Sequence, residues 1–403
     1  MYQSPFLQRQ DPFSRIHVPE LDGIRGWACL SVLTAHCFTG IVKAAPDSWI
    51  IKFNTHTLWL LLSGVDLFFV LSGFLIGGVL LDTRNHPHFF KNFWIRRASR
   101  IFPVYYLTFF TYVLALIVTS TFGISRFDNW LLAEYRPPLW TFATFMQSVP
   151  FALGGYSGPR WMAMTWSLAI EEQFYILFPF AVYFLRRRPL VLIVIAGIIV
   201  APIMRDVLER VFGHWYGPYV LLPSRMDGIL YGVAAALILR NATAFRMVCR
   251  FRFVLDLVAL LILYSIVTNW VFPWWTGQSG VIYPLKQSML AIMWMIVIIR
   301  VFTYQNSYFN SIWRNIILCK IGLISYALYM YHQAINGLVH GIFFNQEPTI
   351  SSPKHIIAAV CIVAIAVGLS ILSYIYLESP IRRFGAATAS RLLPPRETAR
   401  SAS

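Results

Sequence analysis

Charged side chains are scarce in this sequence. Only 12% of its 403 residues are Asp, Glu, Lys or Arg, against roughly 25% in an ordinary soluble domain. Apolar residues make up 58% of the chain. So few charges cannot cover a water-facing surface, and most of the outer surface must therefore face lipid. The composition excludes a soluble enzyme, a fibrous protein and a disordered chain.

Several chemical signatures are also missing. The five cysteines lie in or beside apolar runs, at spacings that match neither a disulfide scaffold nor a zinc site. The chain has no Gly-x-x-x-x-Gly-Lys loop, no Gly-x-Ser-x-Gly motif and no His-Glu-x-x-His motif. ATP-driven transport, serine hydrolysis and zinc proteolysis therefore lose support, and we predict no metal site. The polar N-terminus shows no signal-peptide pattern.

Long apolar runs fill most of the chain. A membrane-spanning helix needs about 20 apolar residues. Ten segments are candidates: 24–44, 57–81, 101–122, 164–185, 190–211, 226–240, 254–272, 282–303, 321–344 and 355–377. We therefore predict an all-α polytopic bundle of about ten transmembrane helices over 21–385. It follows a cytoplasmic segment, 1–20, and precedes a disordered cytoplasmic tail, 386–403.

Basic residues predict the orientation. Lys and Arg number 33 against 17 Asp and Glu, and such residues collect in cytoplasmic loops. With both termini cytoplasmic and ten spans, most of them lie inside. An eleventh apolar stretch, 139–153, is short; if it crossed, the basic run 186–188 would lie outside. We predict that it is a re-entrant or surface-lying piece of an outer loop, 123–163. The basic excess then reflects topology, and we predict no nucleic-acid partner.

Ionisable side chains at membrane depth are functional candidates, because each costs at least about 2.5 kcal/mol. Arg25 and His36 are eleven residues apart in the first span, which puts them on one helix face with a rise of roughly 16 Å. A helix-packing hydrogen bond explains His36 equally well. Glu171 and Glu172 point about 100° apart in the fourth span, so one of them can face a cavity. A carboxylate beside a histidine raises its basicity, as a general base requires.

Other polar residues in the spans have competing explanations. For Asp66, Arg225 and Asp227 we favour mutual ion pairing slightly over chemistry. Tyr329 and His332 belong to an aromatic stripe in the ninth span. Such a stripe is more typical of packing than of a site.

A cluster of arginines precedes the third span. Arg96 and Arg100 lie one helical turn apart with Arg97 beside them, and Arg382 and Arg383 follow the last span. Such clusters anchor helices on the cytoplasmic side. They equally suit a phosphate-bearing ligand, since arginine grips phosphate with two hydrogen bonds. Both interpretations stay open.

Seven short motifs occur in order between about residues 20 and 385. They are Leu21-Asp22-Gly23-Ile24-Arg25-Gly26 with His36, Gly64-Val65-Asp66-Leu67-Phe68-Phe69-Val70-Leu71-Ser72-Gly73-Phe74, Arg96-Arg97-x-x-Arg100-Ile101-x-Pro103, Trp166-Ser167-Leu168 with Glu171 and Phe174-Tyr175, Arg225-x-Asp227-Gly228, Ser325-Tyr326-x-Leu328-Tyr329-x-x-His332, and Glu378-x-Pro380-x-Arg382-Arg383. In this order the sequence resembles the membrane acyltransferase type 3 family. Ser72, inside the second motif, is a further polar candidate.

The resemblance implies an enzyme of the inner (cytoplasmic) membrane. Members of the family transfer an acyl group, usually acetyl from acetyl-CoA, to hydroxyls of carbohydrates such as exopolysaccharide, O-antigen or peptidoglycan. The resemblance also implies that Arg25 and His36 are the family's essential pair and that Glu171 is its carboxylate, with Glu172 at a variable position. Membrane lipid surrounds such a protein, and no oligomeric state is predicted.

Residues and resemblance combine into one hypothesis. Acetyl-CoA or another acyl-CoA docks from the cytoplasm, with its phosphates on Arg96, Arg97 and Arg100. His36, oriented by Glu171 or a neighbouring polar group, takes the proton of a sugar hydroxyl that then attacks the thioester. Arg25 holds CoA or the developing charge, and an acyl-histidine intermediate stays open. The alternative is a secondary transporter or exporter of a sugar- or lipid-linked substrate, with the buried charges as a proton relay.

Overall fold

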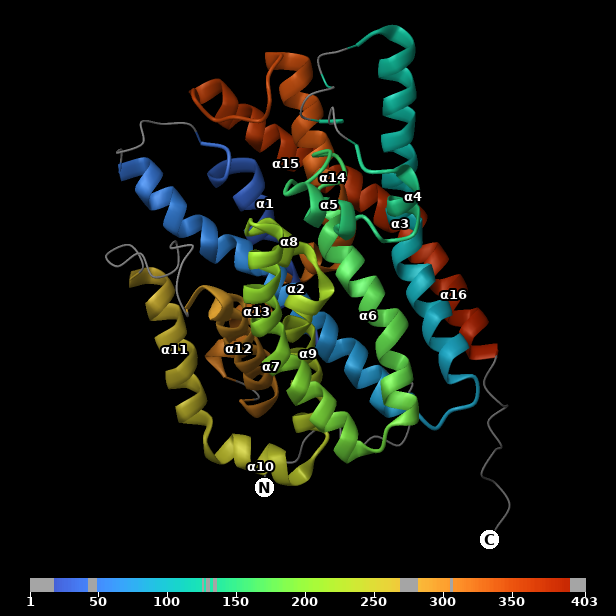
Figure 1. The fold of residues 1–403 in the computed structure, drawn as a ribbon, viewed down its shortest axis with the longest axis vertical. Coiled ribbons are helices and arrows are strands. Elements are labelled where there is room, and N and C mark those ends of the chain that lie inside the picture. Colours follow the sequence, from blue (N-terminus) through green and yellow to red (C-terminus); the bar gives the residue numbers. More distant parts are fainter. Residues whose placement is uncertain are drawn as a thin grey trace.

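The computed structural model describes residues 18–42, 49–124, 127, 131–132, 136–268, 282–304 and 307–391. These residues form a helical bundle without a β-strand (Figure 1). The helices are α1 Pro19–Thr34, η1 Ala35–Thr39, α2 Trp49–Thr83, α3 Phe89–Phe122, α4 Leu139–Ala143, α5 Ser148–Gly154, α6 Thr165–Phe184, α7 Arg187–Phe212, α8 Tyr216–Val220, α9 Leu222–Leu239, α10 Ala242–Arg250, α11 Arg252–Thr268, α12 Ile282–Thr303, α13 Tyr308–Trp313, α14 Ile316–Phe344, α15 Pro353–Ser373, η3 Tyr374–Glu378 and α16 Ser379–Arg391. The predicted all-α class is confirmed.

Six helical segments among the described residues are long and apolar enough to cross a membrane. They are Leu60–Thr83, Phe89–Phe122, Arg187–Phe212, Leu222–Leu239, Pro284–Thr303 and Pro353–Ser390. Each overlaps one of the ten predicted spans. The count of ten and the orientation stay predictions. Of the predicted disordered tail, 386–403, residues 386–391 are the last part of the helix α16, and the rest lies outside the described residues, as does the segment before residue 18.

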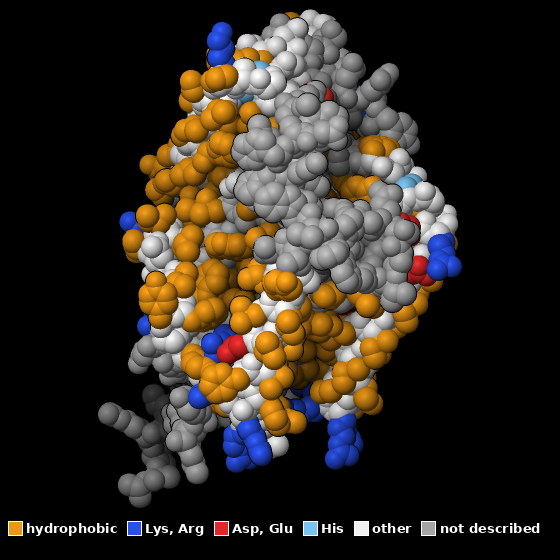
Figure 2. All heavy atoms as spheres, turned by 90° about the vertical axis from the view of Figure 1, so that its left-hand side faces the viewer, with side chains coloured by type: hydrophobic (Ala, Val, Ile, Leu, Met, Phe, Trp, Pro, Cys, Tyr) orange, Lys and Arg blue, Asp and Glu red, His pale blue; other side chains and the backbone are white. Residues whose placement is uncertain are grey.

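The flanks of the bundle are largely apolar, and the largest groups of Lys and Arg side chains on the face in Figure 2 lie at one end. Figure 2 shows a broad hydrophobic surface above clusters of Lys and Arg side chains at the lower end of that face. The α2–α3 turn, the α6–α7 junction and α10 all lie at this end of the molecule (Figure 1). We call it the arginine end. An apolar flank of this kind is what a lipid-facing surface requires.

The stretch 139–153 folds as two short helices. α4 has five residues and α5 has seven, whereas a crossing helix needs about 20. Gln147, between them, is fully buried and donates hydrogen bonds to the Thr165 carbonyl at 3.0 Å and to Tyr105 Oη at 3.3 Å. The polar side chain that interrupts this apolar stretch therefore ties it to α6 and α3.

Backbone-to-backbone contacts fix the helices that carry the candidate site. A Cβ atom added to Gly26 of α1 would lie 2.0 Å from the Leu318 carbonyl oxygen of α14, and one added to Gly322 would lie 2.0 Å from that of Asp22. In the same way, a Cβ atom on Gly73 of α2 would meet the Ile229 carbonyl of α9. Small residues permit such close approach between helices in a membrane. α1 and α14 therefore have one fixed register.

Candidate active site

Two connected cavities enter the bundle from the arginine end. The outer one has a volume of about 320 Å³. Five arginines line it: Arg25 of α1, Arg97 and Arg100 of α3, Arg240 of α9 and Arg382 of α16. Asp22, Asp82 and Glu378 are its carboxylates. The cationic side chains outnumber the anionic ones, which suits an anionic ligand.

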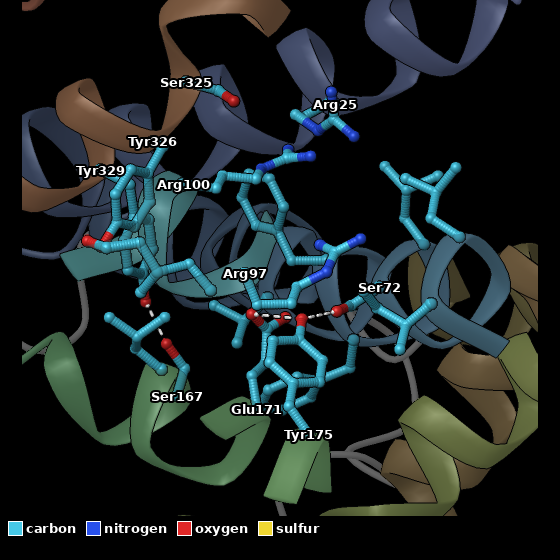
Figure 3. Close-up of a pocket in the computed structure, with 18 of the residues that line it drawn as sticks. Arg25, Ser72, Arg97, Arg100, Ser167, Glu171, Tyr175, Ser325, Tyr326 and Tyr329 are labelled. Carbon is cyan, nitrogen blue, oxygen red and sulfur yellow. Dashed lines mark hydrogen bonds between the residues drawn. The ribbon is translucent and has the colours of Figure 1, made fainter. Parts of the chain in front are cut away.

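The inner cavity continues the outer one toward the middle of the bundle. It has a volume of about 120 Å³ and shares Arg25, Arg97, Arg100, Ser325 and Tyr326 with the outer cavity. Its polar wall adds Ser72, Ser167, Glu171, Tyr175 and Tyr329. Figure 3 shows Arg25 and Arg100 across this space from Glu171 and Tyr175, with Arg97 between the two groups. We refer to the two cavities together as the shaft.

Glu171 takes part in a hydrogen-bond chain across the shaft. The Tyr175 hydroxyl donates to Glu171 Oε2 at 3.2 Å, and Ser72 of α2 hydrogen-bonds to the same hydroxyl. The Arg97 guanidinium lies 5.8 Å from the centre of the Tyr175 ring. Glu172 is buried and does not line the shaft. The two adjacent carboxylates therefore face different surroundings.

The predicted arginine cluster divides in two. Arg97 and Arg100 line the shaft, whereas Arg96 does not, and its Nε donates to Asn92 Oδ1 at 2.7 Å. Of the two arginines after the last predicted span, Arg382 lines the outer cavity.

Sequence reasoning did not predict Arg240 as a site residue, although it lines the outer cavity. Its side chain donates two hydrogen bonds to Asp82, at 2.6 and 2.7 Å.

Arg25 enters the shaft from α1, as its helix face predicts. Its Nη1 atom lies 3.0 Å from Asp22 Oδ1, one turn earlier. The pair is only partly buried, with 15% of the Arg25 side chain and 17% of the Asp22 side chain exposed. Arg25 therefore keeps other donors for a ligand in the shaft.

His36 lies on the π-helical turn η1, where the α-helical pattern of α1 changes. Such turns are frequent at functional sites. The His36 Nδ1 atom lies 2.8 Å from Nε2 of His332 on α14. The Asn336 side chain donates to the His36 carbonyl at 3.2 Å. His36 is thus held by α14, and we call His36 and His332 the histidine pair.

The shaft ends beside the histidine pair without including it. Ser167, Tyr329 and Met330 line the inner cavity, and neither histidine is a lining residue. The Tyr329 hydroxyl hydrogen-bonds to Ser167 at 2.8 Å. The centre of the Tyr329 ring lies 5.8 Å from that of His332. Tyr329 therefore stands between the shaft and the pair.

The expected contact between Glu171 and His36 does not form. Within the described residues, Glu171 bonds to Tyr175 and His36 bonds to His332. Sequence reasoning had kept His332 among the polar candidates but rated packing as the more typical role of its stripe. Only its Ser-Tyr-x-Leu-Tyr-x-x-His motif signalled more, and nothing in that motif identifies His36 as its partner.

The remaining charged candidates form ion pairs away from the shaft. Arg225 of α9 binds Asp66 of α2 at 2.9 Å and lies against aromatic rings, the nearest being Tyr219 at 5.0 Å. Asp227 pairs with Arg205 of α7 at 2.8 and 3.1 Å. The sequence predicted pairing among the three candidates but not the part played by Arg205.

The fold and site define a multi-pass membrane protein with a cationic shaft that ends at Tyr329, beside a pair of histidines. Residues 18–375 match the family model described as an acyltransferase domain, the type 3 acyltransferases. The chain belongs to this family, as its motifs predict.

Curated relatives cover nearly all of the chain. YrhL of Bacillus subtilis, named provisionally as a peptidoglycan O-acetyltransferase, is 28% identical over 93% of this chain and 56% of its own length. The peptidoglycan O-acetyltransferase OatA of Listeria monocytogenes is 26% identical over 94% of this chain and 58% of its own. The chain thus spans little more than half the length of these relatives. No solved structure gives a significant match.

Proposed function

We propose that this chain is a membrane O-acetyltransferase that moves an acetyl group from acetyl-CoA to a hydroxyl of a carbohydrate. The observation that carries the proposal is the arginine-lined shaft that leads from one end of the bundle to Tyr329, beside the histidine pair. The names of the relatives support O-acetyl transfer, and they make peptidoglycan the first acceptor to test. Exopolysaccharide and O-antigen are further acceptors of the same chemistry.

The donor fits the shaft by charge and by shape. The CoA phosphates would bind Arg97, Arg100 and Arg382 in the wide outer cavity, since guanidinium groups bind phosphate with paired hydrogen bonds. The narrow pantetheine arm would follow the inner cavity toward Tyr329. Its length of roughly 15–20 Å matches the helical rise of roughly 16 Å from Arg25 to His36.

The chemistry would take place at the inner end of the shaft. His36 accepts the proton of the acceptor hydroxyl, and the oxygen forms a bond to the thioester carbonyl carbon. The carbon–sulfur bond then breaks, the CoA thiolate leaves, and the proton on His36 passes to it. Arg25 would bind the donor from α1. The Tyr329 side chain would have to move for the thioester to reach His36, because it stands between them.

The same proposal fixes the topology. Acetyl-CoA is a cytoplasmic metabolite, so the arginine end would face the cytoplasm, in agreement with the positive-inside rule. Ten spans with both termini inside, in the inner membrane, satisfy this arrangement. The acceptor would then approach His36 from the outer side.

The test measures CoA release by the full-length protein in liposomes that carry acetyl-CoA on the arginine side. We expect CoA release that depends on an added muropeptide, together with a mass gain of one acetyl group on that acceptor. Flux of the sugar without CoA release would contradict the proposal and favour the transporter. Acetyl-CoA hydrolysis at an equal rate with and without acceptor would also contradict it.

A further inference from the structure

A chain of hydrogen bonds runs from the α14 backbone to the ring of His36. The Nδ1 atom of His332 lies 2.7 Å from the Tyr329 carbonyl oxygen, one turn earlier on the same helix. The Nε2 atom of His332 lies 2.8 Å from Nδ1 of His36. The two ring planes are within 4° of parallel.

These hydrogen bonds determine which ring nitrogen of each histidine carries the hydrogen. A carbonyl oxygen accepts hydrogen bonds and cannot donate them, so Nδ1 of His332 must carry a hydrogen. In a neutral imidazole the other nitrogen is then an acceptor. Nε2 of His332 therefore accepts from Nδ1 of His36. The lone pair of neutral His36 is on Nε2, the nitrogen that points away from the pair.

Burial keeps His332 in this neutral form. Only 1% of its surface is exposed, and Leu328, one turn earlier on α14, belongs with Cys29 and Leu33 of α1 to a buried apolar cluster. A buried cation without an anionic partner is strongly unfavourable. Among the described residues, the His332 ring bonds to backbone carbonyls of α14, those of Tyr329 and Leu328, and to the ring of His36.

We infer that His332 is a positioning residue, which holds His36 in the tautomer that presents Nε2 as the proton-accepting atom. The inference deepens the proposed function and depends on it. His332 does not touch the substrate. When Nε2 of His36 accepts the acceptor proton, its Nδ1–H bond to His332 remains and becomes charge-assisted, which strengthens it.

Asn336 completes the support from α14. Its side chain lies one turn beyond His332 and donates to the carbonyl of His36, so that both the ring and the backbone of η1 are held by one helix face. In a serine hydrolase an aspartate sets the tautomer of the catalytic histidine. Here a neutral ring would do so, and its loss should cost less than loss of a carboxylate.

The test compares three variants of His332 and one control. His332→Leu removes the acceptor, and we expect kcat to fall about 10- to 1,000-fold with an unchanged KM for acetyl-CoA. His332→Gln places an amide oxygen near the position of Nε2, and we expect it to recover most of that loss. His332→Ala should regain activity when imidazole is added. The matched control His340→Gln changes another buried histidine of α14, and its kcat should stay within about twofold.

A spectroscopic measurement makes the inference independent of turnover. Nitrogen-15 NMR of histidine-labelled protein, with the His36 signal assigned from a His36→Ala sample, should show the hydrogen on Nδ1 in the wild type. In His332→Leu the signal should shift toward the Nε2–H tautomer. Wild-type kcat in His332→Leu, or a wild-type spectrum with the hydrogen on Nε2, would overturn the inference.

Failure of the proposed function would look different. If His36→Ala transferred acetyl groups normally, His36 would not be the base, whatever the tautomer in the spectrum. If His36→Ala were inactive while His332→Leu kept wild-type kcat, the proposed function would stand and the role of His332 would fall.

Discussion

The shaft and the ion-pair network around α9 contain the same kinds of charged residue in very different settings. In the network, Arg205 and Asp227 are each about 2% exposed and form two hydrogen bonds with one another. In the shaft, Arg25 and its partner Asp22 stay 15% and 17% exposed beside a cavity. Charge at membrane depth therefore has two uses here. Paired and enclosed charges hold helices together, and charges along a cavity remain available to a ligand.

We expect the largest effect from a substitution that breaks the ion-pair network. Asp227→Ala leaves Arg205 buried without its carboxylate, and removal of one partner of a buried pair typically costs about 3–5 kcal/mol. We expect a drop of that size in the free energy of unfolding, measured by denaturant titration of purified protein. The control Asp206→Ala breaks an exposed pair with Arg210 and should cost below about 1 kcal/mol. A stable but inactive Asp227→Ala protein would contradict this structural role and indicate that Asp227 takes part in activity.

A smaller effect, on the affinity for CoA, should distinguish two neighbouring arginines of α3. Hydrogen bonds to charged groups contribute about 1.5–3 kcal/mol, so Arg97→Ala should raise the Kd for CoA about 10- to 100-fold. Arg96→Ala, with its side chain on Asn92, should change that Kd less than about threefold. Binding by isothermal calorimetry at two salt concentrations tests both, because the Arg97→Ala protein should also show weaker salt dependence. Equal losses in the two variants would mean that the cluster anchors the helix and does not bind the donor.

The smallest effect concerns the hydrogen-bond chain at Glu171. Tyr175→Phe removes the hydroxyl between Ser72 and Glu171, a bond of about 1 kcal/mol in net stability. We expect kcat to fall by up to about tenfold, with the thermal midpoint lowered no further than in a matched variant that also loses one hydrogen-bonded hydroxyl. Tyr331→Phe, which loses a hydroxyl bonded to Ser373, is the matched control and should turn over normally. A lower midpoint in Tyr175→Phe alone would assign that hydroxyl to stability.

The same comparison shows what the sequence can predict. The relative directions of side chains on one helix follow from its periodicity. Glu171 and Glu172 were predicted to point in different directions, and in the structure only Glu171 lines the shaft. Relations between helices do not follow from periodicity. His36 and His332 are 296 residues apart, and their contact depends on the register that Gly26 and Gly322 impose on α1 and α14.

Two other features also required the tertiary structure. Nothing in the sequence of α7 distinguishes Arg205 as the partner of Asp227, with which it forms an ion pair. The π-helical turn at Ala35–Thr39 interrupts the 3.6-residue period from which one shared helix face was predicted for Arg25 and His36. The hydrogen-bond pattern at the end of a helix depends on tertiary packing. Composition and residue spacing therefore do not predict a π-helical turn.

The most direct test of the central claim compares wild type with His36→Ala in acetyl transfer from radiolabelled acetyl-CoA to a muropeptide, with CoA binding measured on the same samples. We predict that His36→Ala binds CoA with the wild-type Kd and loses transfer by at least about 100-fold. Transfer by His36→Ala at the wild-type rate would contradict the account.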